Sequence, residues 1–141
     1  MTWRYGDGAL WAEFKHGGDQ IGALYEPFDD DVFERVRAAV QAGDVVSTVG
    51  ISRPNWVAGI SADGVLVETL RSRQMGSGPQ LVPAWMINRA WHHLRTHGHL
   101  SQKHLLNELN VKRSAVVCGL LARFADVDIQ CDKPVVLQHH S

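Results

Sequence analysis

The chain has 141 residues, of which 45% are hydrophobic and 21% charged, and this balance excludes an intrinsically disordered or fibrous protein. No apolar run reaches the roughly 18 residues of a membrane span, and the first residues lack the profile of a secretory signal. Only two cysteines are present, Cys118 and Cys131, too few for a disulfide framework. We therefore expect a cytoplasmic protein with no membrane partner, nucleoid-associated if it binds DNA.

The formal net charge of −1 conceals an uneven distribution along the chain. Residues 1–50 hold nine acids and four Lys/Arg, a charge of −5, whereas residues 51–125 hold nine Lys/Arg and three acids, a charge of +6. Residues 126–141 contribute −2. A basic block of this kind is typical of proteins that bind anions such as nucleic acid, although Lys and Arg also commonly solvate an exposed face.

We predict that residues 1–80 form an α/β lobe with short antiparallel strands. The Gly6-Asp7-Gly8 turn indicates a hairpin over residues 3–15, and residues 21–25 resemble a further short strand. One of the acids at 29–31 can cap a helix that runs to about Gln41. Runs rich in β-branched residues then predict three strands, at residues 45–51, 56–60 and 65–70. The breakers in residues 71–83 predict an exposed connector that carries basic side chains.

We predict that residues 81–141 form a second lobe, with three helices followed by a hairpin. The apolar pattern and the stop signals place the helices at residues 83–97, 102–109 and about 112–124, and the two strands at residues 127–129 and 135–137. This is the element order of a winged helix-turn-helix, in which the last helix can enter the major groove of DNA. We therefore predict an α+β fold in which the N-terminal lobe packs on a C-terminal winged helix.

The third predicted helix has an apolar inner face and a mixed outer face. Its start carries two basic residues, Lys112 and Arg113, that can reach bases or phosphates. The predicted outer face also includes Val116, Gly119 and Arg123, and the glycine would permit close approach of the helix backbone to DNA. Winged helices also serve as protein-interaction modules, so the element order alone leaves both functions open.

Several sequence segments resemble one known family. They are Ser52-Arg-Pro-Asn-Trp, Ser61-Ala-Asp-Gly-Val-Leu-Val-Glu-Thr, Val82-Pro-Ala-Trp-Met-Ile-Asn, His99-Leu-Ser-Gln and Leu109-Asn-Val-Lys-Arg-Ser-Ala-Val-Val-Cys-Gly-Leu-Leu-Ala-Arg-Phe. Over about residues 45–130 the chain resembles the N-terminal DNA-binding region of actinobacterial modification-dependent HNH restriction endonucleases. The resemblance implies a reader of duplex DNA that contains 5-methylcytosine. The family joins this region to a nuclease domain, for which 141 residues leave no room, so we expect a standalone reader.

Recognition of 5-methylcytosine requires more than burial of one methyl group, which contributes only ~0.8 kcal/mol, or about fourfold in affinity. In one mechanism the methyl packs on a small apolar surface or an arginine plane in the major groove, and Arg53, Arg71, Arg73 and Arg113 are candidates. In the other, the base is extruded into an aromatic pocket. Trp56 would then stack on it and Asn55 would bond its edge, although Trp56 is slightly better suited to the core, as a residue that opens a strand.

We expect a DNA-binding protein without catalytic activity, cofactor or metal. No Gly-x-Ser-x-Gly elbow, phosphate-binding loop or HNH-like metal constellation is present, and Cys118 lies among apolar residues as a packed thiol. His93 and His97 share a helical face but lack the glutamate of a zinc hydrolase. The predicted DNA contacts are Arg53, Asn55, Trp56, Arg71, Arg73, Gln74, Lys112, Arg113 and Ser114. The alternatives are a methylation-indifferent winged-helix transcriptional regulator and a protein-interaction adaptor.

Overall fold

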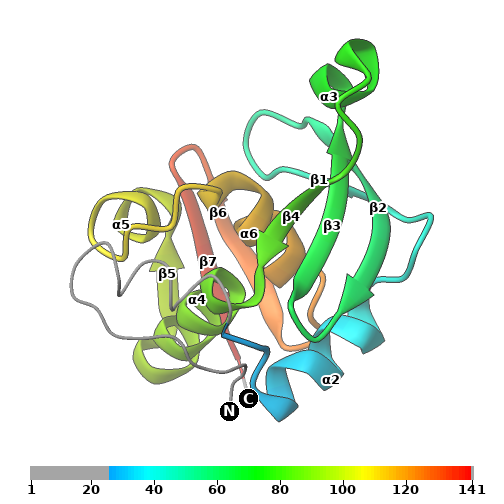
Figure 1. The fold of residues 1–141 in the computed structure, drawn as a ribbon. Coiled ribbons are helices and arrows are strands. Elements are labelled where there is room, and N and C mark those ends of the chain that lie inside the picture. The colour runs from blue at the N-terminus through cyan, green and yellow to red at the C-terminus, as the bar shows by residue number, and fades with distance from the viewer. Residues whose placement is uncertain (1–25, 141) are drawn as a thin grey trace.

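The computed structural model describes residues 26–140. Within this range the chain is a mixed α+β structure with five helices and two antiparallel sheets (Figure 1). The predicted hairpin at residues 3–15 and the strand at residues 21–25 lie outside the described part. None of the helices in the described part is both long enough and apolar enough to cross a lipid bilayer.

The first sheet has four strands in the order β1-β2-β3-β4, and their bounds are β1 Val45–Ser47, β2 Pro54–Ser61, β3 Gly64–Thr69 and β4 Gln80–Pro83. Side chains alternate between its faces because successive residues of a strand point to opposite sides. On β2, Asn55 and Val57 are buried whereas Trp56 between them is half-exposed. Helix α2, Asp30–Ala39, contributes Val32 and Val36 to the same core.

The second sheet has three strands in the order β5-β7-β6, with bounds β5 His99–Ser101, β6 Val127–Asp132 and β7 Val135–His139. Three helices accompany it, and their bounds are α4 Ala84–His97, α5 Gln102–Asn107 and α6 Ser114–Leu121. Trp91 of α4 is fully buried, with its ring edge-on to Phe124 and 4.2 Å below the Arg35 guanidinium carbon. Arg35 also donates a 2.7 Å hydrogen bond to Asp126, which connects α2 to the turn before β6.

The structure confirms the α+β class and the positions of most predicted helices and strands, but it adds three elements. Strands β4 and β5 are short and were missed because neither contains an alternating run. The predicted exposed connector at residues 71–83 is wrong at both ends, because helix α3, Leu70–Met75, forms at its start and β4 forms at its end. A capping box between Thr69 and Ser72 starts this helix, and Gly76 in the left-handed conformation (φ 66°) ends it. Two good caps therefore stabilise a helix too short to show periodicity.

Helix α6 is packed directly against β1. Seven of its eight residues are buried, and the α-carbon of Gly119 faces the backbone of Ser47. A Cβ atom at position 119 would lie 2.8 Å from the Ser47 carbonyl oxygen and 3.3 Å from a methyl group of Val46. Glycine is therefore required at this position by the approach of a strand of the first sheet, which brings the two halves of the described chain into contact.

We predict that Gly119→Ala destabilises the protein by about 1–3 kcal/mol because the new methyl group overpacks the contact with β1. This loss outweighs the ~1 kcal/mol that alanine gains over glycine in an unstrained helix. Denaturant unfolding of both proteins measures the difference. Gly59→Ala is the control, since a Cβ atom there would lie 3.9 Å from its nearest neighbour. A more stable Gly119→Ala variant would contradict the packing of α6 on β1.

Candidate nucleic-acid interface

A cavity of about 660 Å³ lies where the loop between β1 and β2, the junction of β3 with α3 and the start of α6 meet. Its lining residues are Thr48, Ser52, Arg53, Pro54, Asn55, Thr69, Leu70, Arg71, Lys112, Arg113, Ser114, Ala115 and Val116. Six of the nine predicted contact residues are in this set: Arg53, Asn55, Arg71, Lys112, Arg113 and Ser114. Residues up to 68 positions apart in the sequence, Thr48 and Val116, therefore line one cavity.

The cationic wall of this cavity is formed at the start of α6. Arg113 is half-buried and donates weak hydrogen bonds of 3.4 Å to the Leu81 carbonyl oxygen and the Gln80 side-chain oxygen. Burial lowers the pKa of its guanidinium, and arginine nevertheless stays cationic at neutral pH. Among residues 26–140 no side chain caps α6, and the first amides of a helix have no carbonyl within the helix to bond. Ser114, Ala115 and Val116, the first residues of α6, line the cavity beside these cations, and the start of a helix suits an anion.

Asn55 provides a fixed polar group in the lining of the same cavity. Its side chain is only 4% exposed, and the amide nitrogen donates to the carbonyl oxygens of Val46 and Arg53, both at 3.4 Å. The alternation of β2 explains this placement, since Asn55 and the buried Val57 share one face of the sheet. The sequence indicated Asn55 only as a side chain that would bond the edge of an extruded base, and the structure places it at the beginning of β2.

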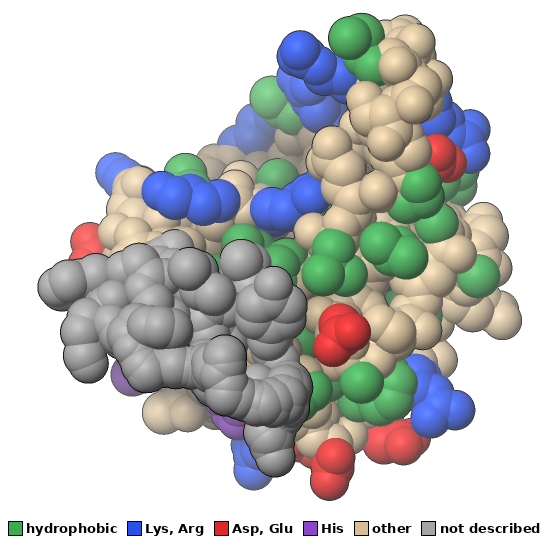
Figure 2. All heavy atoms as spheres, viewed as in Figure 1, with side chains coloured by type: hydrophobic (Ala, Val, Ile, Leu, Met, Phe, Trp, Pro, Cys, Tyr) green, Lys and Arg blue, Asp and Glu red, His purple; other side chains and the backbone are tan. Residues whose placement is uncertain are grey.

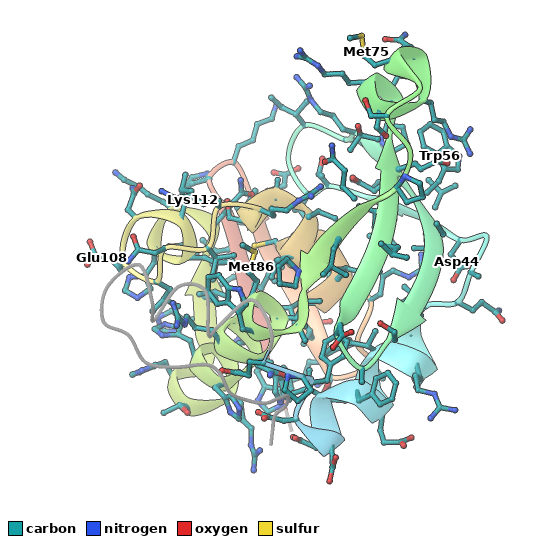
Figure 3. The ribbon with its side chains drawn as sticks, viewed as in Figure 1. Asp44, Trp56, Met75, Met86, Glu108 and Lys112 are labelled. Carbon is teal, nitrogen blue, oxygen red and sulfur yellow. The ribbon has the colours of Figure 1, made fainter. Side chains whose placement is uncertain are left out.

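The other three predicted residues lie outside the cavity lining. Trp56 points to the face of the sheet opposite Asn55, and Figure 3 shows it on the side away from Lys112. The Arg73 guanidinium carbon lies 3.9 Å from the centroid of the Trp56 ring, and its Nε lies 3.5 Å from Glu68. Gln74 is exposed on α3. No aromatic side chain is among the residues found to line the cavity, so an aromatic pocket containing both Asn55 and Trp56 does not form in the described part of the chain.

The outer face predicted for the third helix is largely covered. Val116 and Gly119 are buried, the latter against β1. Arg123 donates hydrogen bonds to the carbonyl oxygens of Ala39 and Val45 and lies 3.4 Å from the Asp44 carboxylate. The prediction that this face is open to DNA is therefore wrong. Its residue types resemble those of an exposed helical face, and only the position of β1 distinguishes the two arrangements.

A second cavity of about 680 Å³ adjoins the first, because Thr48, Arg53 and Ala115 line both. Its remaining walls come from the loop between β1 and β2, from α5 and from the β6–β7 hairpin, and include Lys103 and Lys133. The Gln102 side-chain oxygen is buried here without a hydrogen-bond partner among residues 26–140. We refer to the two adjoining cavities together as the basic cleft. Lys103 and Lys133 carry no sequence signal beyond their charge and were not predicted.

The Lys and Arg residues of the basic cleft differ from most other Lys and Arg residues at positions 26–140 in having no carboxylate partner there. Of the twelve Lys/Arg at positions 26–140, five have a carboxylate oxygen within 4.0 Å: Arg35, Arg37, Arg73, Arg95 and Arg123. None of these five lines the cleft. Six of the other seven do, namely Arg53, Arg71, Lys103, Lys112, Arg113 and Lys133. Figure 2 shows Lys and Arg side chains along the upper part of the molecule, from α3 across to α5.

Three histidines that line neither cavity form a cluster around His93, with their rings tilted to one another. The ring centroid of His93 lies 4.3 Å from that of His97 and 4.6 Å from that of His104. In the described part of the chain, no group of three or more His, Cys, Asp or Glu side chains is arranged to hold a metal ion. Cys118 is buried, which raises the pKa of its thiol to about 12 and keeps it protonated at neutral pH.

Because of the histidine cluster around His93, we expect the free energy of unfolding to fall in acid. Burial, together with the neighbouring His97, His104 and His99, holds the pKa of His93 below its ordinary value of 6.5. Between that lowered pKa and pH 6.5 the unfolded chain binds the proton more readily, so stability falls as the pH falls. We expect the urea midpoint to drop on acidification from pH 7 to 5.5, and to drop less in His93→Gln. An equal drop in both proteins would contradict this role of His93.

Comparison with known proteins assigns the chain to no family. No family model matches the sequence, and neither a curated protein nor a solved structure matches it. The chemistry of the basic cleft is therefore argued from the residues that line it: six cations with no carboxylate partner among residues 26–140, the start of a helix, a fixed amide, several apolar side chains and one carboxylate, Asp132.

Proposed function

We propose that the protein binds double-stranded DNA in the basic cleft and prefers sites that contain 5-methylcytosine. The observation that carries this proposal is the gathering of six cations without a described carboxylate partner around two adjoining cavities. Cations left together without counter-charges repel one another, and a phosphate backbone would relieve that repulsion. Phosphate contacts of this kind supply most of the sequence-independent affinity for DNA.

The arrangement of the C-terminal elements supports a winged helix-turn-helix. The order α4-β5-α5-α6-β6-β7, with β7 between β5 and β6 in the sheet, is the order of that motif. In this proposal α6 contributes its first residues to DNA, because its side is packed on β1. Lys112 is exposed just before α6, and phosphate oxygens at the start of a helix accept hydrogen bonds from backbone N–H groups.

The preference for 5-methylcytosine rests on the apolar residues among these cations and on the family resemblance. Leu70 and Arg71, at the start of α3, line the first cavity, and the apolar side chains of Ala115 and Val116 line it too. A methyl group that projects into the major groove could pack on such a surface while a guanidinium bonds the neighbouring guanine. The position of Trp56 on the other face of the sheet favours this groove mechanism over stacking of an extruded base on Trp56.

A protein-interaction adaptor is the second candidate, and one observation favours it. Ile51, 68% exposed, and Leu106, 38% exposed, both line the second cavity and would suit an apolar partner. A methylation-indifferent transcriptional regulator would use the same cationic residues as the proposed reader. The three functions therefore differ in two measurable properties, namely affinity for any duplex and the effect of methylation on it.

We predict that the protein binds a methylated duplex at least about fourfold more tightly than the same duplex without the methyl group, since burial of one methyl supplies that factor. Gel-shift titration of matched duplexes measures both affinities. Equal affinities would reject the methyl preference and favour the regulator. Absence of binding at low salt would reject both DNA-binding functions and favour the adaptor.

We predict that Lys112→Ala and Arg113→Ala each weaken DNA binding and reduce the salt slope of log K by about 1, because each removes one phosphate contact. Titrations at several salt concentrations measure the slope. Arg95→Ala is the matched control, since Arg95 lies 3.7 Å from Asp31, away from the basic cleft, and its loss should leave binding unchanged. Lys112 is exposed, so its removal also tests the interface without disturbing the fold. Unchanged binding by both variants would remove the start of α6 from the interface.

A further inference from the structure

We propose that α3 is the helix that enters the major groove and reads base pairs, while the basic cleft beside it holds the phosphate backbone. This inference rests on the proposed function and assigns its sequence-reading element. It differs from the usual arrangement of a helix-turn-helix, in which the last helix of the motif lies in the groove. Here that helix is α6, and its side is packed on β1.

The position of α3 suits entry into a groove. Figure 1 shows it standing out from the rest of the described chain at the end of β3, and Figure 3 shows Met75 at its tip. Met75 is 69% exposed and Leu70 is 54% exposed, although both are large apolar residues. Six residues of helix rise about 9 Å, and the major groove is wide enough to admit an α-helix. A projecting helix with exposed apolar ends therefore fits the groove in size and shape.

The helix is also held firmly enough to serve as a reading element. Ser72 is only 3% exposed. Its hydroxyl oxygen accepts a 2.8 Å hydrogen bond from the Thr69 backbone amide, and its own amide donates a 3.0 Å hydrogen bond to the Thr69 hydroxyl. On the other side, Arg73 stacks on Trp56 and pairs with Glu68, so it connects α3 to the outer face of the sheet. In this proposal Trp56 and Arg73 position α3. Both were predicted to contact DNA directly, and neither lines the basic cleft.

The exposed side of α3 presents groups that can read base edges. Gln74 follows Leu70 by four residues and Arg71 by three, so all three lie on neighbouring parts of the helix surface. Leu70 and Arg71 line the first cavity, which makes this side of α3 continuous with the basic cleft. A glutamine side chain can bond adenine through two hydrogen bonds, an arginine can do the same with guanine, and an apolar group can pack on a pyrimidine methyl. The helix itself contains no acidic residue that would repel the DNA.

Titration of the full chain with a duplex that it binds tests this assignment. Gln74→Ala should lower affinity by about tenfold, because a good bidentate contact to a base is lost. Gln130→Ala is the matched control, an exposed glutamine of β6 outside the basic cleft, and should bind as the wild type does. Methyl green, which occupies the major groove, should displace the protein, whereas the minor-groove ligand distamycin should not.

Two outcomes would overturn the inference in different ways. If the wild type binds and Gln74→Ala binds equally well, α3 is rejected as the reading helix and the proposed function stands. The same follows if distamycin displaces the wild type and methyl green does not. Failure of the wild type to bind any duplex would reject the proposed function itself and the inference with it. Because Gln74 is exposed, its replacement should leave the thermal midpoint unchanged, and that measurement separates lost contact from lost folding.

Discussion

The close contact between α6 and β1 determines which surfaces of this protein remain free. It brings the Gly119 backbone against Ser47 and buries most of α6, so the helix can offer only its beginning to a partner. The same contact brings the loop between β1 and β2 next to the residues that precede α6. The two cavities lie on either side of this loop and share Thr48, Arg53 and Ala115. The packing of two apolar surfaces thus sets the geometry of a polar one.

The charge distribution acquires a structural meaning from this geometry. Acids at the start of α2 contact the helical half of the chain: Asp31 pairs with Arg95, and Asp29, the N-cap residue, hydrogen-bonds the His92 side chain. Cations elsewhere in the described chain are therefore partly neutralised, whereas those of the basic cleft have no described carboxylate partner. A near-neutral chain can in this way present a local positive field, and such a field attracts a polyanion more strongly than the net charge suggests.

The sequence predicted the long elements well, and it failed where tertiary packing decides. Apolar periodicity was sufficient for α2 and α4, and six predicted contact residues line one cavity. Helix α3 was missed because six residues are too few to show a period, although Thr69, Ser72 and Gly76 encode its caps. The outer face of α6 was wrongly expected to be open, because Gly119 suits close approach of either DNA or a strand. The split into two lobes at residue 80 stays a prediction.

The most direct test of the account is a map of backbone amide chemical shifts during titration of the labelled protein with a methylated duplex. We predict that the largest changes fall in three segments, residues 52–55, 69–75 and 112–115, which come together around the first cavity and α3. The exposed residues of α2 should change little. Changes centred on α2 or on the outer side of β6, or no changes at all, would contradict DNA binding in the basic cleft.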